Sequence, residues 1–187
     1  MPPKAKITRD MIIDAAFEIA RNDGAETINA RTVSKKLNCS TQPVMYHFKT
    51  IEELKKAVYV KADEFHSAYI ADIQGQSPMK SIGLQYIRFG EKEKHLFRFL
   101  FQTNKFTEKS VSDLTSAEEA EPIFAVIAKT RNIPIEQARV IFKSLFLFAH
   151  GYASMFANND MEYDEETILS DLDLIFDGML YALKGGI

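Results

Sequence analysis

Nine polar, aromatic or turn-forming residues between Arg31 and Lys49 have side chains suited to contacts with a nucleic acid. The amide of Gln42 can donate and accept at the same time, a pattern that matches the major-groove edge of adenine. Thr41 and Pro43 beside it can contact a thymine methyl group. The other candidates suit phosphate oxygens, which position a protein on DNA without reading its sequence: Arg31, Thr32, Ser40, Tyr46, His47 and Lys49. For each residue the alternative is an ordinary exposed side chain.

Two short helices are needed to position these side chains. Asn29 is a good N-cap, and the apolar spacing after it predicts a first helix with one buried face, formed by Ala30, Val33 and Leu37. This helix should end at Leu37, because Asn38 tolerates a left-handed conformation and Cys39 then turns inward.

The second helix is expected to carry the outward-facing contacts. Ser40 is predicted as its N-cap, and Pro43 suits its first turn, where a missing N–H matters little. Val44 and Phe48 should point to the core. Two short helices joined by a tight turn, with an exposed polar second helix, predict a helix-turn-helix.

Residues 7–54 resemble the DNA-binding domain of TetR-family transcriptional regulators. The resemblance lies in Ile-Thr-Arg-Asp-Met-Ile-Ile-Asp-Ala-Ala-Phe-Glu-Ile-Ala-Arg-Asn-Asp-Gly, then the helix-turn-helix, then His-Phe-Lys-Thr-Ile-Glu-Glu-Leu. Two positions depart from the family pattern: Met45 stands where a tyrosine is usual, and Ile51 where a lysine is usual. These departures leave open an alternative, a helical ligand-binding or interaction protein whose head no longer binds DNA.

Length and charge fit such a protein. The chain has 187 residues, 46% of them hydrophobic, with 14 Phe, enough for a sizeable core. Residues 1–50 hold 8 Lys/Arg and 5 Asp/Glu, a balance of +3, whereas residues 51–187 hold 15 and 21, a balance of −6. A basic head on an acidic body favours contact between the head and phosphate, although chance variation of surface charge is the alternative. The single cysteine, and the lack of a secretory or membrane-spanning pattern, predict a cytoplasmic location.

The first helix of the head is expected to begin after Thr8 and to stop at Gly24. Its predicted buried stripe is Met11, Ile12, Ala15, Ala16 and Ile19. The preceding basic segment, residues 1–6, is interpreted as a frayed terminus or as an arm along DNA.

A long helix is predicted to link the head to the body. Thr50 and Glu53 form a capping-box pattern that opens a helix from Ile51 to about Ile73. The body then reads as helices near 79–92, 94–104, 119–131, 135–157 and 164–184, with a mobile loop at 105–117. The last helix has a wide apolar stripe, so the last two helices are expected to form a homodimer interface that includes Phe176 and Met179.

Aromatic residues of the body suggest a ligand site, which the resemblance also implies. The candidates are Phe65, Tyr69, Tyr86, Phe89, Phe99, Phe124, Phe142, Phe146 and His150. Aromatic side chains at helical spacing are also what an ordinary core contains, and His150 is most simply a hydrogen-bonded core residue.

An enzyme finds little support. The four histidines and Cys39 have no metal-ligand spacing, and no Gly-rich phosphate loop or nucleophile motif is present. No cofactor or metal is therefore expected. The sequence predicts an all-α protein with a helix-turn-helix domain at 1–50, before the linking helix, and an effector-binding and dimerisation domain at 51–187. The predicted function is a ligand-responsive repressor that binds a palindromic DNA operator as a homodimer.

Overall fold

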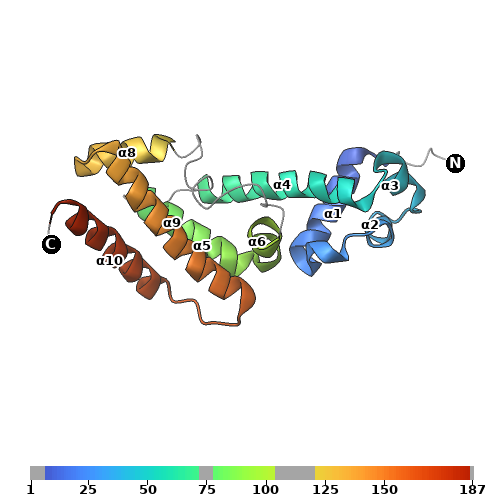
Figure 1. The fold of residues 1–187 in the computed structure, drawn as a ribbon. Coiled ribbons are helices and arrows are strands. Elements are labelled where there is room, and N and C mark those ends of the chain that lie inside the picture. Colours follow the sequence, from blue (N-terminus) through green and yellow to red (C-terminus); the bar gives the residue numbers. More distant parts are fainter. Residues whose placement is uncertain (1–6, 72–77, 104–120, 186–187) are drawn as a thin grey trace. The chain divides into compact units, whose positions relative to one another are not determined.

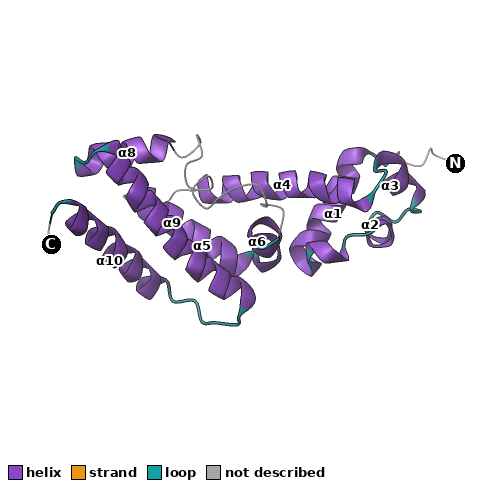
Figure 2. Ribbon diagram, viewed as in Figure 1, coloured by secondary structure: helices purple, strands orange, loops and turns teal. Residues whose placement is uncertain are grey.

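The computed structural model describes residues 7–71, 78–103 and 121–185, and every regular element in these ranges is a helix (Figures 1 and 2). The predicted all-α class is therefore confirmed. The elements in chain order are α1 (Arg9–Asp23), the 3-10 turn η1 (Ala25–Thr27), α2 (Ala30–Lys36), α3 (Gln42–His47), α4 (Ile51–Ala71), α5 (Pro78–Lys92), α6 (Lys94–Phe101), α8 (Glu121–Arg131), α9 (Ile135–Asn158) and α10 (Glu165–Leu183).

Two compact units divide the chain. The first contains the residues up to Ala68 together with Glu93–Thr103, and the second contains Tyr69–Lys92 and the residues from Asn104 onward. The predicted basic arm (1–6), the loop at 105–117 and the helix break after residue 73 fall largely outside the described residues. The functional division at residue 50 stays a prediction.

The caps of α1 follow the prediction. The Thr8 hydroxyl accepts a hydrogen bond from the backbone N–H of Met11 at 3.2 Å, and Gly24 ends the helix with a φ of 92°, a conformation that favours glycine. The buried face was predicted correctly except at Met11, which is exposed. Phe17, missing from the predicted stripe, is buried instead.

The N-terminus of α4 is a variant of the predicted capping box. The Thr50 hydroxyl accepts from the backbone N–H of Glu53 at 3.1 Å. The carboxylate of Glu53 accepts from the N–H of Lys49 at 3.0 Å, one residue before the expected partner. Both bonds satisfy backbone groups at the junction between α3 and α4.

Helix α6 packs within the first unit against α1, although about 70 residues separate the two helices in the sequence. Glu93, the only residue between α5 and α6, accepts from Arg21 Nε at 2.8 Å and from Arg21 Nη2 at 2.5 Å. The Tyr59 hydroxyl of α4 donates to the backbone carbonyl of Leu100 at 3.3 Å. A bidentate pair on a buried carboxylate is geometrically demanding, so it fixes the start of α6 against the end of α1.

In the second unit α9 is the central helix, and it packs against α5, α8 and α10. Gly90 of α5 allows a close approach to α9, because a Cβ there would lie 2.6 Å from the backbone oxygen of Ala153. By length and composition α9 could cross a membrane, the one described helix that could. One of its faces, however, lies in the core of this unit through Ala138, Ile141, Leu145, Ala149 and Ala153.

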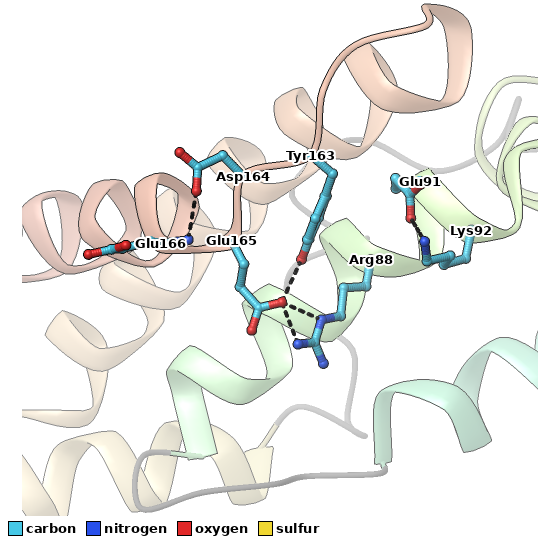
Figure 3. Close-up of polar contacts among 7 residues, drawn as sticks. All are labelled: Arg88, Glu91, Lys92, Tyr163, Asp164, Glu165 and Glu166. Carbon is cyan, nitrogen blue, oxygen red and sulfur yellow. Dashed lines mark hydrogen bonds and ion pairs between the residues drawn. The ribbon is translucent and has the colours of Figure 1, made fainter.

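A polar cluster fastens the start of α10 to α5 (Figure 3). The guanidinium of Arg88 donates to Glu165 Oε2 from Nη2 at 2.5 Å and from Nε at 3.1 Å, and the Tyr163 hydroxyl lies 3.5 Å from the same oxygen. Asp164 caps the helix by accepting from the N–H groups of Glu166 and Thr167. The Thr167 hydroxyl also donates to this carboxylate at 2.6 Å, and this bond, with the backbone bonds, lowers the pKa of the Asp164 carboxyl.

Candidate nucleic-acid interface

Helix α2 is held at both ends by local hydrogen bonds. Asn29 Oδ1 accepts from the N–H groups of Arg31 and Thr32, each at 3.0 Å, and the Thr32 hydroxyl accepts from the N–H of Asn29 at 3.0 Å. The helix ends at Lys36, and Leu37 is its C-cap. This reciprocal cap fixes where α2 begins and therefore where the turn after it falls.

The turn between α2 and α3 has the predicted left-handed residue. Asn38 adopts a φ of 49°, and the N–H of Cys39 bonds back to the carbonyl of Ser34 at 3.0 Å. Asparagine tolerates this conformation better than most residues. The Cys39 side chain is half-buried, as a packed thiol in this turn would be.

Helix α3 is anchored by two apolar side chains. Val44 and Phe48 are fully buried, as predicted, and the Arg9 guanidinium lies 4.8 Å from the Phe48 ring centroid. The predicted N-cap was wrong, because the cap residue is Thr41 and not Ser40. The carbonyl of Thr41 accepts the first bond of the helix, from Met45 N–H at 3.1 Å, which places Pro43 within the first turn.

The predicted DNA contacts lie close together on α2, the turn and α3. Six are exposed: Arg31, Ser40, Thr41, Gln42, Tyr46 and Lys49. Three are half-buried: Thr32, Pro43 and His47. The Thr32 hydroxyl already takes part in the hydrogen bonds that cap α2. It therefore stabilises the start of the helix and is also a candidate DNA contact.

His47 and Tyr46 form a small supported group at the end of α3. His47 Nε2 lies 3.1 Å from the backbone oxygen of Ile7, and its ring meets the Tyr46 ring edge-on with a centroid separation of 5.2 Å. His47 therefore connects α3 to Ile7, two residues before the start of α1. Tyr46 is the most exposed large side chain of the helix, at 81%.

Three further exposed residues of this surface were missed by the sequence-based prediction. Met45 is 47% exposed on α3, and Lys35 and Lys36 are exposed in the last turn of α2. Helical spacing would have identified Lys35, two residues after the buried Val33, but not Met45 or Lys36, which lie closer to the buried faces. The lysines add positive charge beside the predicted phosphate contacts, which suits a nucleic-acid surface.

The predicted ligand residues divide between the two units. Phe65 and Phe99 belong to the first, where their rings pack edge-on against Phe17 at 5.6 Å and Tyr59 at 5.5 Å. The others belong to the second. Among them Tyr69 and Phe89 pair at 5.4 Å, apart from the larger cluster formed by Tyr86, Phe124, Phe142, Phe146 and His150.

The larger cluster contains one polar pair. The Tyr86 hydroxyl and His150 Nδ1 are 2.9 Å apart, and the Phe146 ring packs against both. Burial lowers the pKa of His150 and raises that of Tyr86, so both groups are neutral near pH 7. A neutral hydrogen-bonding pair among aromatic rings could orient a small aromatic molecule or complete a core.

No group of three or more His, Cys, Asp or Glu side chains suited to a metal ion occurs in the described ranges 7–71, 78–103 and 121–185.

The sequence is similar to that of a curated protein over about half of its length. No family model matches the sequence. An uncharacterized HTH-type transcriptional regulator, YobS from Bacillus subtilis (strain 168), is 27% identical over 94 residues, which are 48% of this chain and 49% of that protein. The chain thus spans about half the length of the curated relative it matches.

Two solved structures match nearly the whole chain. The multidrug binding protein EbrR, solved in complex with imidazole, has a TM-score of 0.57 and 19% identity, covering 94% of this chain and 97% of EbrR. The TetR family repressor AlkX from Dietzia sp. strain DQ12-45-1b has a TM-score of 0.45 and 16% identity, covering 92% and 97%. The resemblance to TetR-family regulators is confirmed at the level of the fold, an N-terminal helix-turn-helix followed by a helical body.

Proposed function

We propose that this chain is a sequence-specific DNA-binding transcriptional regulator, a ligand-responsive repressor that binds a palindromic operator as a homodimer in the cytoplasm. The observation that supports this most directly is α3. Two fully buried side chains anchor it, and its opposite face carries exposed residues that can bind bases and phosphates. The relative YobS carries the name of an HTH-type regulator, which agrees with this function.

On DNA we assign reading of bases to α3 and positioning to its surroundings. Gln42 donates to and accepts from an adenine, with Thr41 and Pro43 beside a thymine methyl. Arg31, Ser40 and Lys49 are exposed around them and bind phosphates, as do Thr32 and His47 where their groups reach the backbone. Tyr46 is exposed on α3 and also contacts the DNA.

The homodimer is proposed to form through exposed apolar stripes on α9 and α10. The α9 stripe is Val140, Leu147, Gly151 and Met155, and the α10 stripe is Leu174, Gly178 and Tyr181. Their spacings of three, four and seven keep each stripe on one helix face. Among the described residues, no atom beyond the neighbouring residues and the backbone of the same helix comes within 4 Å of a Cβ built on Gly151 or Gly178, so a partner helix could approach closely there.

One residue of the predicted interface, Phe176, does not lie on these exposed stripes. Phe176 is only 6% exposed, and the Arg131 guanidinium lies 4.7 Å from its ring centroid. Its side chain therefore belongs to the core of its own unit. Leu174, on the other face of α10, is 71% exposed and takes its place in the proposed interface.

The effector is proposed to bind in the second unit at the aromatic cluster around Tyr86 and His150. Five aromatic rings supply apolar contact area, and the neutral Tyr86–His150 pair supplies the polar group that orients a ligand. EbrR is described as a multidrug binding protein, which supports a ligand-binding role for a body of this fold.

A gel-shift experiment with the DNA next to the protein's own gene tests the proposal. The wild type should bind one fragment with a dissociation constant far below that for random DNA of the same length, whereas Gln42→Ala should lose the part of this preference that comes from the base pair Gln42 reads. Folded Gln42→Ala protein with an unchanged melting temperature serves as the control. Equal, weak binding of the wild type to all fragments would instead favour the alternative, a head that no longer reads DNA.

A further inference from the structure

The two faces of α3 can be assigned from burial. An α-helix turns about 100° per residue, so the side opposite Val44 and Phe48 lies at the residue midway between them, Tyr46. The exposed fractions agree: Tyr46 is 81% exposed, and Met45 on the flank is 47% exposed. Gln42 precedes Tyr46 by four residues and shares its face.

The Tyr46 ring is also supported from one side. Its neighbour His47 contacts it edge-on, with ring planes at 86°, while His47 Nε2 lies 3.1 Å from the Ile7 backbone oxygen. This support restricts the orientations of the Tyr46 ring before any partner binds. A restricted side chain loses less conformational entropy on binding than a free one.

We propose that Tyr46 is a specificity-determining residue whose ring contacts a thymine methyl in the major groove, beside the base pair that Gln42 reads. The inference rests on the proposed DNA-binding function and gives Tyr46 a role different from phosphate contact. Its basis is chemical, because the thymine methyl is the apolar group that bases present in the major groove. Tyr46 presents an exposed apolar ring on the face that enters that groove.

The spacing of the two residues predicts the spacing of the two bases. Four residues of helix span about 6 Å, and successive base pairs are about 3.4 Å apart. The thymine should therefore lie one or two base pairs from the adenine that Gln42 contacts. A tyrosine that touched only phosphate would show no such dependence on base or position.

Selection of binding sites from a randomised DNA pool tests this assignment, with wild type, Tyr46→Ala, Tyr46→Phe and Lys49→Ala compared. Wild type should select a thymine that Tyr46→Ala does not, at a position one or two base pairs from the one that Gln42→Ala relaxes. Tyr46→Phe should keep this preference, because the ring remains. Lys49→Ala, the matched control for phosphate contact, should weaken binding and leave the selected sequence unchanged.

Replacing the selected thymine with deoxyuridine removes only the methyl group. This should weaken wild-type binding by roughly fourfold, the value of one buried methyl-sized group, and leave Tyr46→Ala unaffected. Uniform weakening of Tyr46→Ala on all sequences would overturn the assignment, as would Tyr46→Phe behaving like Tyr46→Ala. If wild type selects no sequence, the proposed function itself fails.

Discussion

Leu174→Ala offers a quantitative test of the homodimer interface. Leu174 is 71% exposed on α10, so the substitution removes apolar surface that the isolated chain does not bury. Full burial of a leucine side chain contributes about 1.5–3 kcal/mol. Covering the exposed share of Leu174 should then contribute about 1–2 kcal/mol in each protomer.

A symmetric dimer contains the contact twice. Leu174→Ala should therefore weaken association by about 2–4 kcal/mol in total, or roughly 30-fold to several hundred-fold in the dimer dissociation constant. The melting temperature of the monomeric form should change little. Phe176→Ala, at a residue only 6% exposed, should instead destabilise the fold by about 3–5 kcal/mol.

Sedimentation equilibrium over a wide range of protein concentration measures the association. Val126→Ala is the matched control, because Val126 is an apolar side chain 44% exposed on α8, outside the α9 and α10 stripes. Its dimer constant should equal that of the wild type. An unchanged constant for Leu174→Ala would place the interface elsewhere, and a wild type that stays monomeric would refute the homodimer.

Three further predictions concern DNA, ligand and pH. Gln42→Ala should lose about 1–3 kcal/mol of binding free energy at one base pair. Lys49→Ala should instead weaken binding to all sequences and lower the slope of log affinity against log salt concentration by about one, as titrations at several salt concentrations would show. A screened effector should bind about 1–3 kcal/mol more weakly in the presence of operator, because coupling is reciprocal and is proposed to be negative; equal affinities by calorimetry would refute this. Burial lowers the pKa of His66 from 6.5 to about 4, so the unfolded chain binds this proton first and stability decreases as the pH falls below about 6.5. Urea unfolding at pH 7 and pH 5 should show a loss of stability that is about 2 kcal/mol smaller in His66→Phe than in the wild type; an identical loss in that variant would exclude His66 as a source.

The sequence predicted the start of a helix correctly where a single side chain caps its first turn. Thr8, Asn29 and Thr50 each accept the backbone hydrogen bond expected of a cap. Ser40 was predicted as a cap one residue too early, because the carbonyl of Thr41 accepts the first hydrogen bond of the helix. The error moved one boundary and left the exposed face of α3 unchanged.

Contacts between distant segments could not be read from helical periodicity. Phe176 lies on a wide apolar stripe, and its burial beneath Arg131 shows that this part of the stripe belongs to the core. Leu174 stands in an apolar run with Ile175 and Phe176, so its neighbours in the sequence do not identify it as exposed. The pairing of Arg21 with Glu93 spans 72 residues and leaves no local signal.

That ion pair limits how the head can be moved to another protein. A chimaera made by joining residues up to Ala71 to a foreign body would leave the Arg21 guanidinium without Glu93, and Tyr59 without the carbonyl of Leu100. It would also expose the α1 surface that α6 covers. The transplantable part is therefore discontinuous: a graft that keeps operator recognition intact should carry Glu93–Phe101 along with the first 71 residues.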